Sequence, residues 1–194
     1  MKFIRMFSTE EYKGSYHYLK TQKKYEILRT VLYFSISLAL FAAGWITTKS
    51  RLNLLTVVAI LGCLPACKST VGMIMFLRYK GCGDASVEEI EKHCKGLDGL
   101  YDMVFTSYEK TYQIAHLVVR GNTICGFTED ASFDEQAFYK HMDGILKADS
   151  FKDVTIKVFH DIRKYTERME QLKELSQEEA YTAGIISTLK SVSL

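Results

Sequence analysis

Residues 30–48, TVLYFSISLALFAAGWITT, contain no charged side chain and decide the fold of this chain. A helix of about 20 apolar residues crosses a bilayer core roughly 30 Å thick, so the stretch is long enough to span a membrane. Arg29 and Lys49 bound it, and Trp45 lies near one end, where aromatic rings prefer the headgroup layer. Core helices of water-soluble proteins usually keep a polar face, which this stretch lacks. The sequence therefore predicts a first transmembrane helix.

A second apolar stretch, residues 52–77, reads LNLLTVVAILGCLPACKSTVGMIMFL and is also long enough to span. Pro65 removes a backbone donor, which predicts a kink. Lys68 lies deep in the apolar run, where an ammonium costs roughly 2.5–3.5 kcal/mol on insertion scales. Two interpretations of Lys68 stay open. It marks a partner site, a lipid headgroup or a water-filled cavity, or it snorkels towards an interface.

The distribution of basic residues predicts the orientation of this two-helix hairpin. The short loop between the stretches holds Lys49 and Arg51, whereas the flanks are richer in lysine and arginine. Cytoplasmic flanks carry such an excess, so both termini are expected in the cytoplasm of a multi-pass protein of the cell membrane. The flanks would also favour an anionic leaflet of the lipid bilayer. The flanking residues are Lys13, Lys20, Lys23, Lys24, Arg29, Arg78 and Lys80.

These signals divide the chain into an N-terminal cytosolic amphipathic arm (1–24), a transmembrane hairpin (25–80) and a cytosolic α/β domain (81–194). In the arm, Ser8-Thr9-Glu10-Glu11 is a capping box that predicts a helix from about Thr9. Tyr12, Tyr16 and Leu19 recur at helical spacing beside lysines. The arm is expected to lie in the headgroup layer or to pack on the cytosolic domain, because amphipathicity alone does not select the partner surface.

Capping and turn signals divide the cytosolic part into short helices and strands. The order is α-β-β-β-α-β-α-α, and the helix between the last two strands predicts a right-handed crossover in a two-layer or three-layer α/β domain. The expected elements are a helix from Ser86 to Gly96, strands at 103–108, 112–119 and 123–128, a helix from Ser132 to about Lys147, a strand at 154–160, and helices at 161–175 and 177–189.

Over residues 86–175 this order resembles the core of the restriction-endonuclease-like nucleases, the PD-(D/E)xK superfamily. The resemblance implies an acidic residue on the second strand and a (D/E)-x-K on the third, which hold Mg²⁺ and activate water. Residues 112–119 and 123–128 contain neither a carboxylate nor a lysine, and Glu129 and Asp130 have no lysine two places on. A membrane-anchored, degenerate nuclease-like enzyme therefore stays an alternative, and no metal or cofactor is expected.

Four residues form a possible pocket or partner site: His116, Cys125, His160 and Asp161. His116 lies mid-strand among apolar neighbours, which is typical of a core histidine. Cys125 could act as a nucleophile beside His116 or His141, although a buried thiol is inert. His160 and Asp161 follow a strand, where sites of open α/β sheets lie, although an N-cap role also explains Asp161.

Composition narrows the function classes. The formal net charge is +2, so the overall charge gives no case for a nucleic-acid partner, and none is expected. Five cysteines, with no spacing tighter than that of Cys63 and Cys67, indicate free thiols in a reducing compartment. Those two could bind a soft metal, but no further ligand is clustered with them.

No catalytic set is found among these residues. The leading hypothesis is a non-enzymatic membrane protein whose hairpin anchors the domain for binding a protein partner or for homo-oligomeric assembly. A channel or transporter subunit is a second alternative. It would need an oligomer with Lys68 lining the pathway, because two helices cannot enclose a pore.

Overall fold

The computed structural model describes residues 12–49, 53–175 and 179–194. The chain divides into two compact units. Among the described residues, one unit is Leu19–Lys80 and the other joins residues 12–18 to Gly81–Leu194. Two long apolar helices and a mixed four-stranded sheet with helices are present, which confirms that part of the predicted fold.

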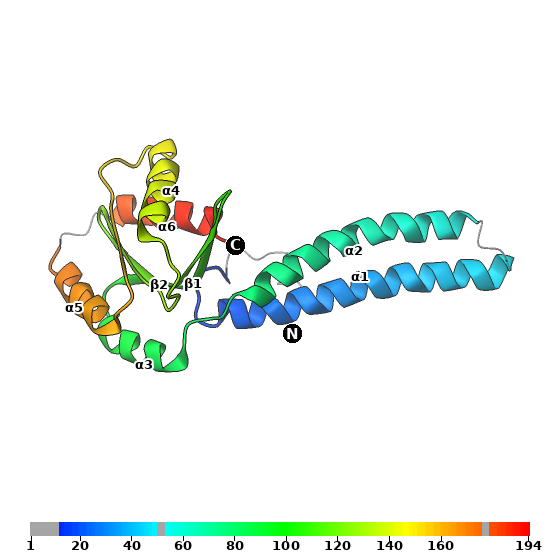
Figure 1. Ribbon diagram of the computed structural model, residues 1–194, viewed down its shortest axis with the longest axis horizontal. Helices are drawn as coiled ribbons and strands as arrows, with labels where there is room; N and C mark the ends of the chain where they lie inside the picture. Colours follow the sequence, from blue (N-terminus) through cyan, green and yellow to red (C-terminus); the bar gives the residue numbers. More distant parts are fainter. Residues whose placement is uncertain (1–11, 50–52, 176–178) are drawn as a thin grey trace. The chain divides into compact units, whose positions relative to one another are not determined.

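The first unit is a pair of helices, α1 (Tyr18–Thr48) and α2 (Leu54–Arg78) (Figure 1). Asn53 caps α2, because its side-chain oxygen accepts a hydrogen bond from the backbone N–H of Thr56 at 2.8 Å. Pro65 lies inside α2, which continues as one helix through it. Both helices match the apolar stretches of the sequence, and α1 also takes in the charged residues before Thr30.

The second unit is built on a sheet with the strand order β1-β2-β3-β4. Its strands are β1 (Asp98–Thr106), β2 (Thr111–Arg120), β3 (Thr123–Phe127) and β4 (Thr155–Phe159). The first three form an antiparallel meander, and β4 lies parallel to β3. The helix α4 (Glu135–Ala148) makes the crossover between them, as parallel neighbours require.

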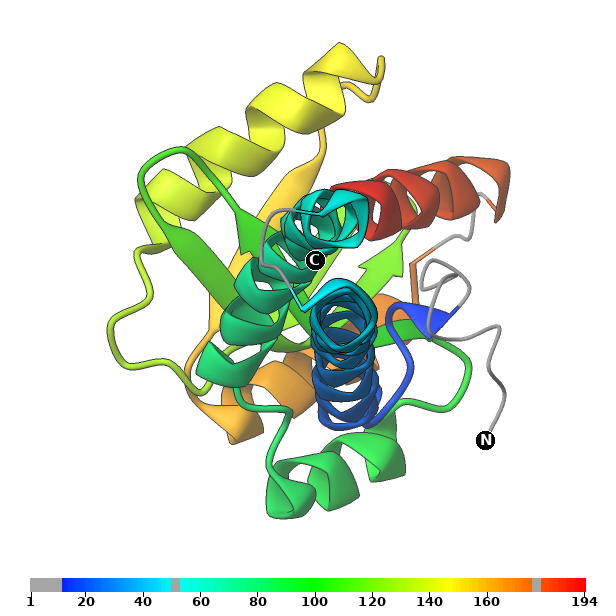
Figure 2. The ribbon, with the colours of Figure 1, turned by 90° about the vertical axis from the view of Figure 1, so that its right-hand side faces the viewer.

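Helices cover both faces of the sheet, so the domain has three layers (Figures 1 and 2). On one face, Phe138, Met142 and Leu146 of α4 share a core with α6 (Glu179–Val192). On the other face, α3 (Asp84–His93) and α5 (Ile162–Lys173) pack on Ala115, Val118 and Cys125. Strand β2 is buried along nearly its whole length, since both of its faces meet a core.

The two edges of the sheet differ in whether other segments cover them. Along β1, the carbonyl of Gly14 accepts from the N–H of Tyr101 at 2.8 Å, and the N–H of Leu194 donates to Val104 at 2.9 Å. Lys13 Nζ also donates to the carbonyl of Ser193 at 2.6 Å. Segments from both ends of the chain thus cover this edge. At the other edge, no further strand pairs with β4 in the described part of the chain.

Several predicted element starts differ from those in the structure. The helix predicted from Ser86 begins at Asp84, and the helix predicted from Ser132 is capped by Asp134, which accepts from the N–H of Ala137 at 3.1 Å. The first strand begins at Asp98 rather than at Met103. The capping signals at residues 8–11 and 176–179 include positions outside the described residues.

Candidate functional site

The surface of the α1–α2 hairpin is apolar. Large hydrophobic side chains project from both helices without cover, including Ile46 at 76% exposed and Leu54 at 79% exposed. Water-soluble proteins rarely expose a contiguous apolar surface of this extent. Others that are exposed are Val31, Leu32, Phe34, Ile36, Leu38, Trp45, Val57, Val58, Ile60, Leu61, Leu64, Val71, Ile74 and Leu77.

The seam of contact between the two helices is made mostly by small and polar residues. The buried residues of α2 are Ala59, Ala66, Ser69 and Phe76, which follow one another at intervals of seven, three and seven residues and so lie on one face of the helix. Gly62 lies in the same series, and a Cβ added to it would come within 2.8 Å of Ser37 Oγ on α1. Small residues let helix backbones approach closely, which is how helices pack inside a membrane.

At one end of the seam the helices are joined by hydrogen bonds. Thr30 Oγ1 and Ser69 Oγ lie 2.8 Å apart, and Arg29 Nε donates to the same Ser69 oxygen at 3.4 Å. Arg29 also pairs with Glu26, whose carboxylate is 3% exposed and accepts from Gln22. This charged cluster lies just before the apolar stretch of α1 begins.

The same contacts fix the level of Lys68 along the hairpin. Because Thr30 meets Ser69, the exposed Lys68 lies level with the start of the first apolar stretch. The apolar section shared by both helices then runs from there to Thr48 and Asn53, whose side chains are joined by a hydrogen bond of 2.9 Å. At 1.5 Å per residue this section is about 25 Å long.

In the second unit, His116 and Tyr165 form a buried pair under α5. The ring of His116 is fully buried on β2, and its Nδ1 lies 2.7 Å from the hydroxyl of Tyr165 on α5. Burial lowers the pKa of His116 to about 3, and burial raises the pKa of Tyr165 well above its usual value. Both groups are therefore neutral at physiological pH, and the bond between them is uncharged.

Two thiols lie on the same face of the sheet as this pair. Cys94 Sγ is 3.9 Å from His116 Nε2, and Cys125 is buried on β3 in the core that contains Tyr165. Burial raises the pKa of both thiols. A protonated thiol beside a neutral histidine is a poor nucleophile, so this arrangement stabilises the core rather than supplying an activated sulfur.

No protein-family model, characterised protein or solved structure matches this chain. Its function has to be argued from the geometry alone. Helices α1 and α2 are long and apolar enough to cross a membrane, and only 17% of the apolar window of each is buried. Among residues 12–49, 53–175 and 179–194, no three His, Cys, Asp or Glu side chains gather in a way that could hold a metal ion.

The structure does not bring the four candidate site residues together. His116 and Cys125 face α3 and α5, whereas the ring of His160 lies 6.2 Å from Phe133, which packs against the core on the α4 side. His160 Nε2 is 3.3 Å from a carboxylate oxygen of Glu135, and both side chains are exposed. His141 contacts Tyr112 in the α4-side core, so the sheet separates it from Cys125.

Asp161 and Glu129 both stabilise helix starts. Asp161 caps α5 by accepting from the N–H of Arg163 at 2.9 Å, which confirms the N-cap interpretation. Glu129 accepts from the N–H of Gly83 at 3.2 Å and from Ser86 Oγ at 2.6 Å, at the start of α3. A carboxylate there also complements the positive end of the helix dipole. Sequence reasoning missed this pairing, because the partners are 43 and 46 residues apart.

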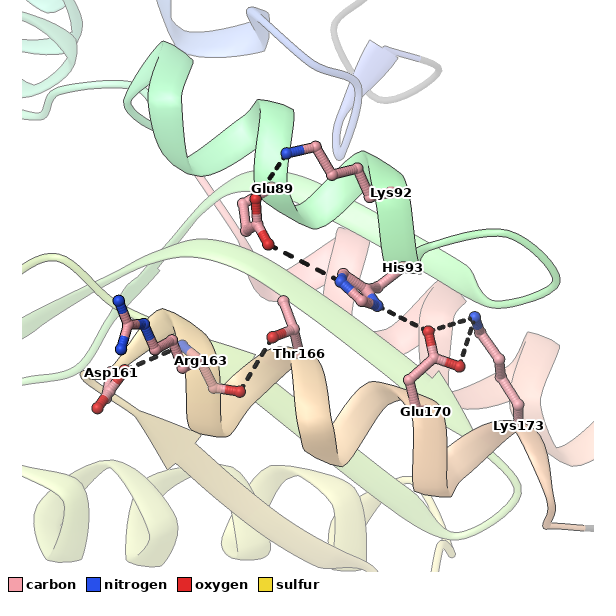
Figure 3. Close-up of polar contacts among 8 residues, drawn as sticks. All are labelled: Glu89, Lys92, His93, Asp161, Arg163, Thr166, Glu170 and Lys173. Atoms are coloured by element: carbon pink, nitrogen blue, oxygen red, sulfur yellow. Dashed lines mark hydrogen bonds and ion pairs between the residues drawn. The ribbon is translucent and has the colours of Figure 1, made fainter.

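The facing helices α3 and α5 are linked by a chain of charged groups on their exposed side (Figure 3). His93 Nδ1 lies 2.8 Å from Glu170, which also pairs with Lys173 at 2.9 Å. Hydrogen bonds from Lys173 and His93 lower the pKa of Glu170. Exposed pairs of this kind contribute little to stability.

Proposed function

We propose that this chain is an integral membrane protein whose hairpin, residues 25–80, anchors the α/β domain at the cytoplasmic face of the membrane. The domain then serves to bind a protein partner or to assemble with further copies. The observation that supports this most directly is the distribution of side chains on the hairpin, where, apart from Phe76, the buried residues of α2 are small or polar and the large apolar residues lie outside.

That distribution is the reverse of the one expected for a pair of helices in water. A helix pair in water buries its large apolar side chains, each worth about 1.5–3 kcal/mol when fully buried. Here Leu54, Leu64 and Ile60 are all more than half exposed, while Ala59 and Ala66 occupy the contact. In hydrocarbon there is no penalty for the outward leucines, and the small residues allow close packing of the helices.

The hydrogen bonds made by threonine hydroxyl groups of the hairpin are also compatible with a hydrocarbon environment. Thr48 Oγ1 donates to the carbonyl of Gly44 at 2.7 Å, and Thr70 Oγ1 donates to Ala66 at 2.9 Å. Thr47 makes the same kind of bond to Ala43 at 2.8 Å. Each hydroxyl is satisfied within its own helix, which is a requirement where no water is present.

The contact between Thr30 and Ser69 supports a specific depth. The shared apolar section of about 25 Å fits slightly inside a hydrocarbon core of roughly 30 Å. Lys68 then lies at the cytoplasmic interface, level with Arg29, which is the snorkelling interpretation of its charge. The end of α2 after Ser69 lies level with the charged start of α1, so we place it outside the hydrocarbon core.

Extraction of membranes tests the anchoring. The full chain is expressed in bacterial cells, and its membranes are washed with alkaline carbonate, which releases peripheral proteins. We expect the chain to stay in the pellet and to be released only by detergent. Ile60→Lys should weaken insertion, since a lysine at the centre of a span costs roughly 2.5–3.5 kcal/mol. Release of the unmodified chain by carbonate alone would contradict the proposal.

A further inference from the structure

The outer edge of β4 has backbone groups available for another strand. The N–H of Thr155 donates to Asn122 at 2.8 Å, and the carbonyl of Phe159 accepts from Thr128 at 3.0 Å, so these residues direct their polar groups towards β3. Because the direction alternates along a strand, those of Ile156 and Val158 point outward. No hydrogen bond outside the β3–β4 ladder involves these two residues in the described part of the chain.

An apolar groove runs along the side of β4 that faces α4. It has a volume of about 270 Å³, and its walls include Phe138 and Tyr139 of α4 and the side chains of Ile156 and Val158. Tyr139 is 46% exposed, although it is a large aromatic residue. The groove can accept apolar side chains from a segment lying beside β4.

A basic groove runs along the other side of β4, which faces α5. It has a volume of about 350 Å³ and is lined by Lys157, Lys164 and Arg168, together with Phe159, Glu167 and Gln171. Lys157 Nζ lies 5.4 Å from the centre of the Phe159 ring. Three cationic groups against one carboxylate make this groove suited to acidic side chains.

We propose that an extended acidic peptide adds to β4 as a further strand of the sheet. Its backbone would bond to the outward groups of Ile156 and Val158. Alternate side chains would then enter the two grooves, apolar ones on the α4 side and acidic ones beside Lys157, Lys164 and Arg168. This inference deepens the partner-binding part of the proposed function and rests on it.

The charge pattern selects such a peptide over a second copy of the chain. Two copies pairing symmetrically with their β4 strands fully overlapped would place the central residue, Lys157, directly opposite itself, and like charges opposite each other destabilise a sheet. A lone lysine also guards an exposed edge against aggregation. Lys164 and Arg168, however, lie on α5 and extend the positive charge beyond the strand. Charges at these positions are not needed to protect the edge of β4 from aggregation.

Fluorescence anisotropy with a synthetic peptide tests the proposal. The probe is a labelled eight-residue peptide that alternates glutamate and valine, titrated with the full chain in detergent micelles. We expect saturable binding that weakens as salt is added. A peptide of the same composition with its glutamates and valines in two blocks should bind at least tenfold more weakly, because it cannot place one kind of side chain in each groove.

Two further comparisons separate strand addition from simple charge attraction. Two peptides are N-methylated at every second residue, one at the odd and one at the even positions. Binding should be lost in the peptide whose methyl groups replace the N–H groups bonded to β4, and preserved in the other. Lys157→Glu with Lys164→Glu should weaken binding at least tenfold. The matched control is Lys95→Glu with Lys140→Glu, which changes the charge equally at exposed positions that do not line either groove.

Each remaining outcome would overturn the proposal. Equal binding of the alternating and block peptides, or insensitivity to N-methylation in both registers, would exclude strand addition. Absence of saturable binding would exclude the acidic peptide. A dimer in analytical ultracentrifugation that is lost in the Ile156→Pro variant would assign the edge to a second copy. Carbonate extraction of the membranes from which each variant is purified reports anchoring separately, so loss of peptide binding is distinguishable from loss of the membrane role.

Discussion

At the scale of single residues, the pair formed by His116 and Tyr165 shows what burial does to a titratable group. The histidine is held neutral because it is buried away from water, with the phenol of Tyr165 and the thiol of Cys94 as its polar neighbours. Sequence alone indicated a core histidine from its apolar neighbours. It did not indicate the partner, because Tyr165 is 49 residues away on a helix whose orientation is set by packing.

This neutral histidine predicts a loss of stability in acid. The pKa of His116 falls from 6.5 to about 3 on folding, so between these values the unfolded chain binds a proton that the folded chain does not. The free energy of unfolding should therefore fall as pH drops below about 6.5, by up to about 1.4 kcal/mol per pH unit. The measurement is urea unfolding of the full chain in detergent, followed by near-UV circular dichroism at several pH values.

One variant isolates this effect from that of the carboxylates. His116→Gln should flatten the pH dependence between pH 6.5 and 4.5, although it also lowers stability overall. Equal slopes in the variant and in the unmodified chain would mean that His116 is protonated without penalty in the folded state.

At the scale of secondary structure, the sequence predicted most elements and fewer of their starts. Strands expected at 112–119 and 154–160 are found as β2 and β4 with small shifts, because alternating or continuous apolar residues mark them clearly. The predicted start of β1, at Met103, was wrong, and the strand begins at Asp98; glycine and aspartate, the types of Gly99 and Asp102, are depleted in strands. Gly99 is needed there because a Cβ would come within 2.6 Å of His116 Nε2, and Asp102 accepts from the N–H of Cys82.

The cap of α5 gives a direct test at this scale. Asp161→Ala removes the acceptor for the N–H of Arg163 and should lower the free energy of unfolding by about 1 kcal/mol. Asp161→Asn keeps a side-chain oxygen in place and should cost much less. Thermal unfolding by far-UV circular dichroism measures both. If the two variants lost the same stability, the loss would come from the charge and not from the cap.

Replacing glycine by alanine should have opposite effects at Gly62, in the seam between α1 and α2, and at Gly144, in α4. Gly62→Ala should destabilise the hairpin, because the new methyl group would meet Ser37 Oγ at 2.8 Å. Gly144→Ala in α4 meets nothing within 4 Å and should stabilise the chain by about 0.4–1 kcal/mol. Combining Gly62→Ala with Ser37→Gly should restore packing. The measurement is unfolding of the helices in mixed detergent micelles. A Gly62→Ala variant as stable as the unmodified chain would contradict the close approach of α1 and α2 at Gly62.

At the scale of the whole molecule, the division into an apolar hairpin and an α/β domain could be predicted from the sequence, because long uncharged stretches have few alternative explanations. The placement of Lys68 could not. Its position in the sequence suggested a charge deep in the apolar run, and only the contact of Thr30 with Ser69 shows that it lies level with Arg29. The candidate site residues likewise could not be grouped without knowing which face of the sheet each one occupies.

Labelling of single cysteines tests the proposed topology. In a variant without the five native cysteines, Lys49→Cys lies next to the loop that joins α1 to α2, and Lys95→Cys lies in the α/β domain. A maleimide that cannot cross membranes should label the first in intact cells and the second only after lysis. Labelling of Lys95→Cys in intact cells would reverse the orientation inferred from the basic flanks.

The covering of β1 by segments far apart in the sequence has a consequence for biosynthesis. Ser193, whose carbonyl accepts from Lys13 at this edge, is made 180 residues after it. Until then the strand is an open template for misassembly, and contacts so distant in sequence form slowly. The hairpin would be inserted before Ser193 and Leu194 reach the edge of β1, so chains truncated before Ser193 should be held in the membrane and prone to aggregation.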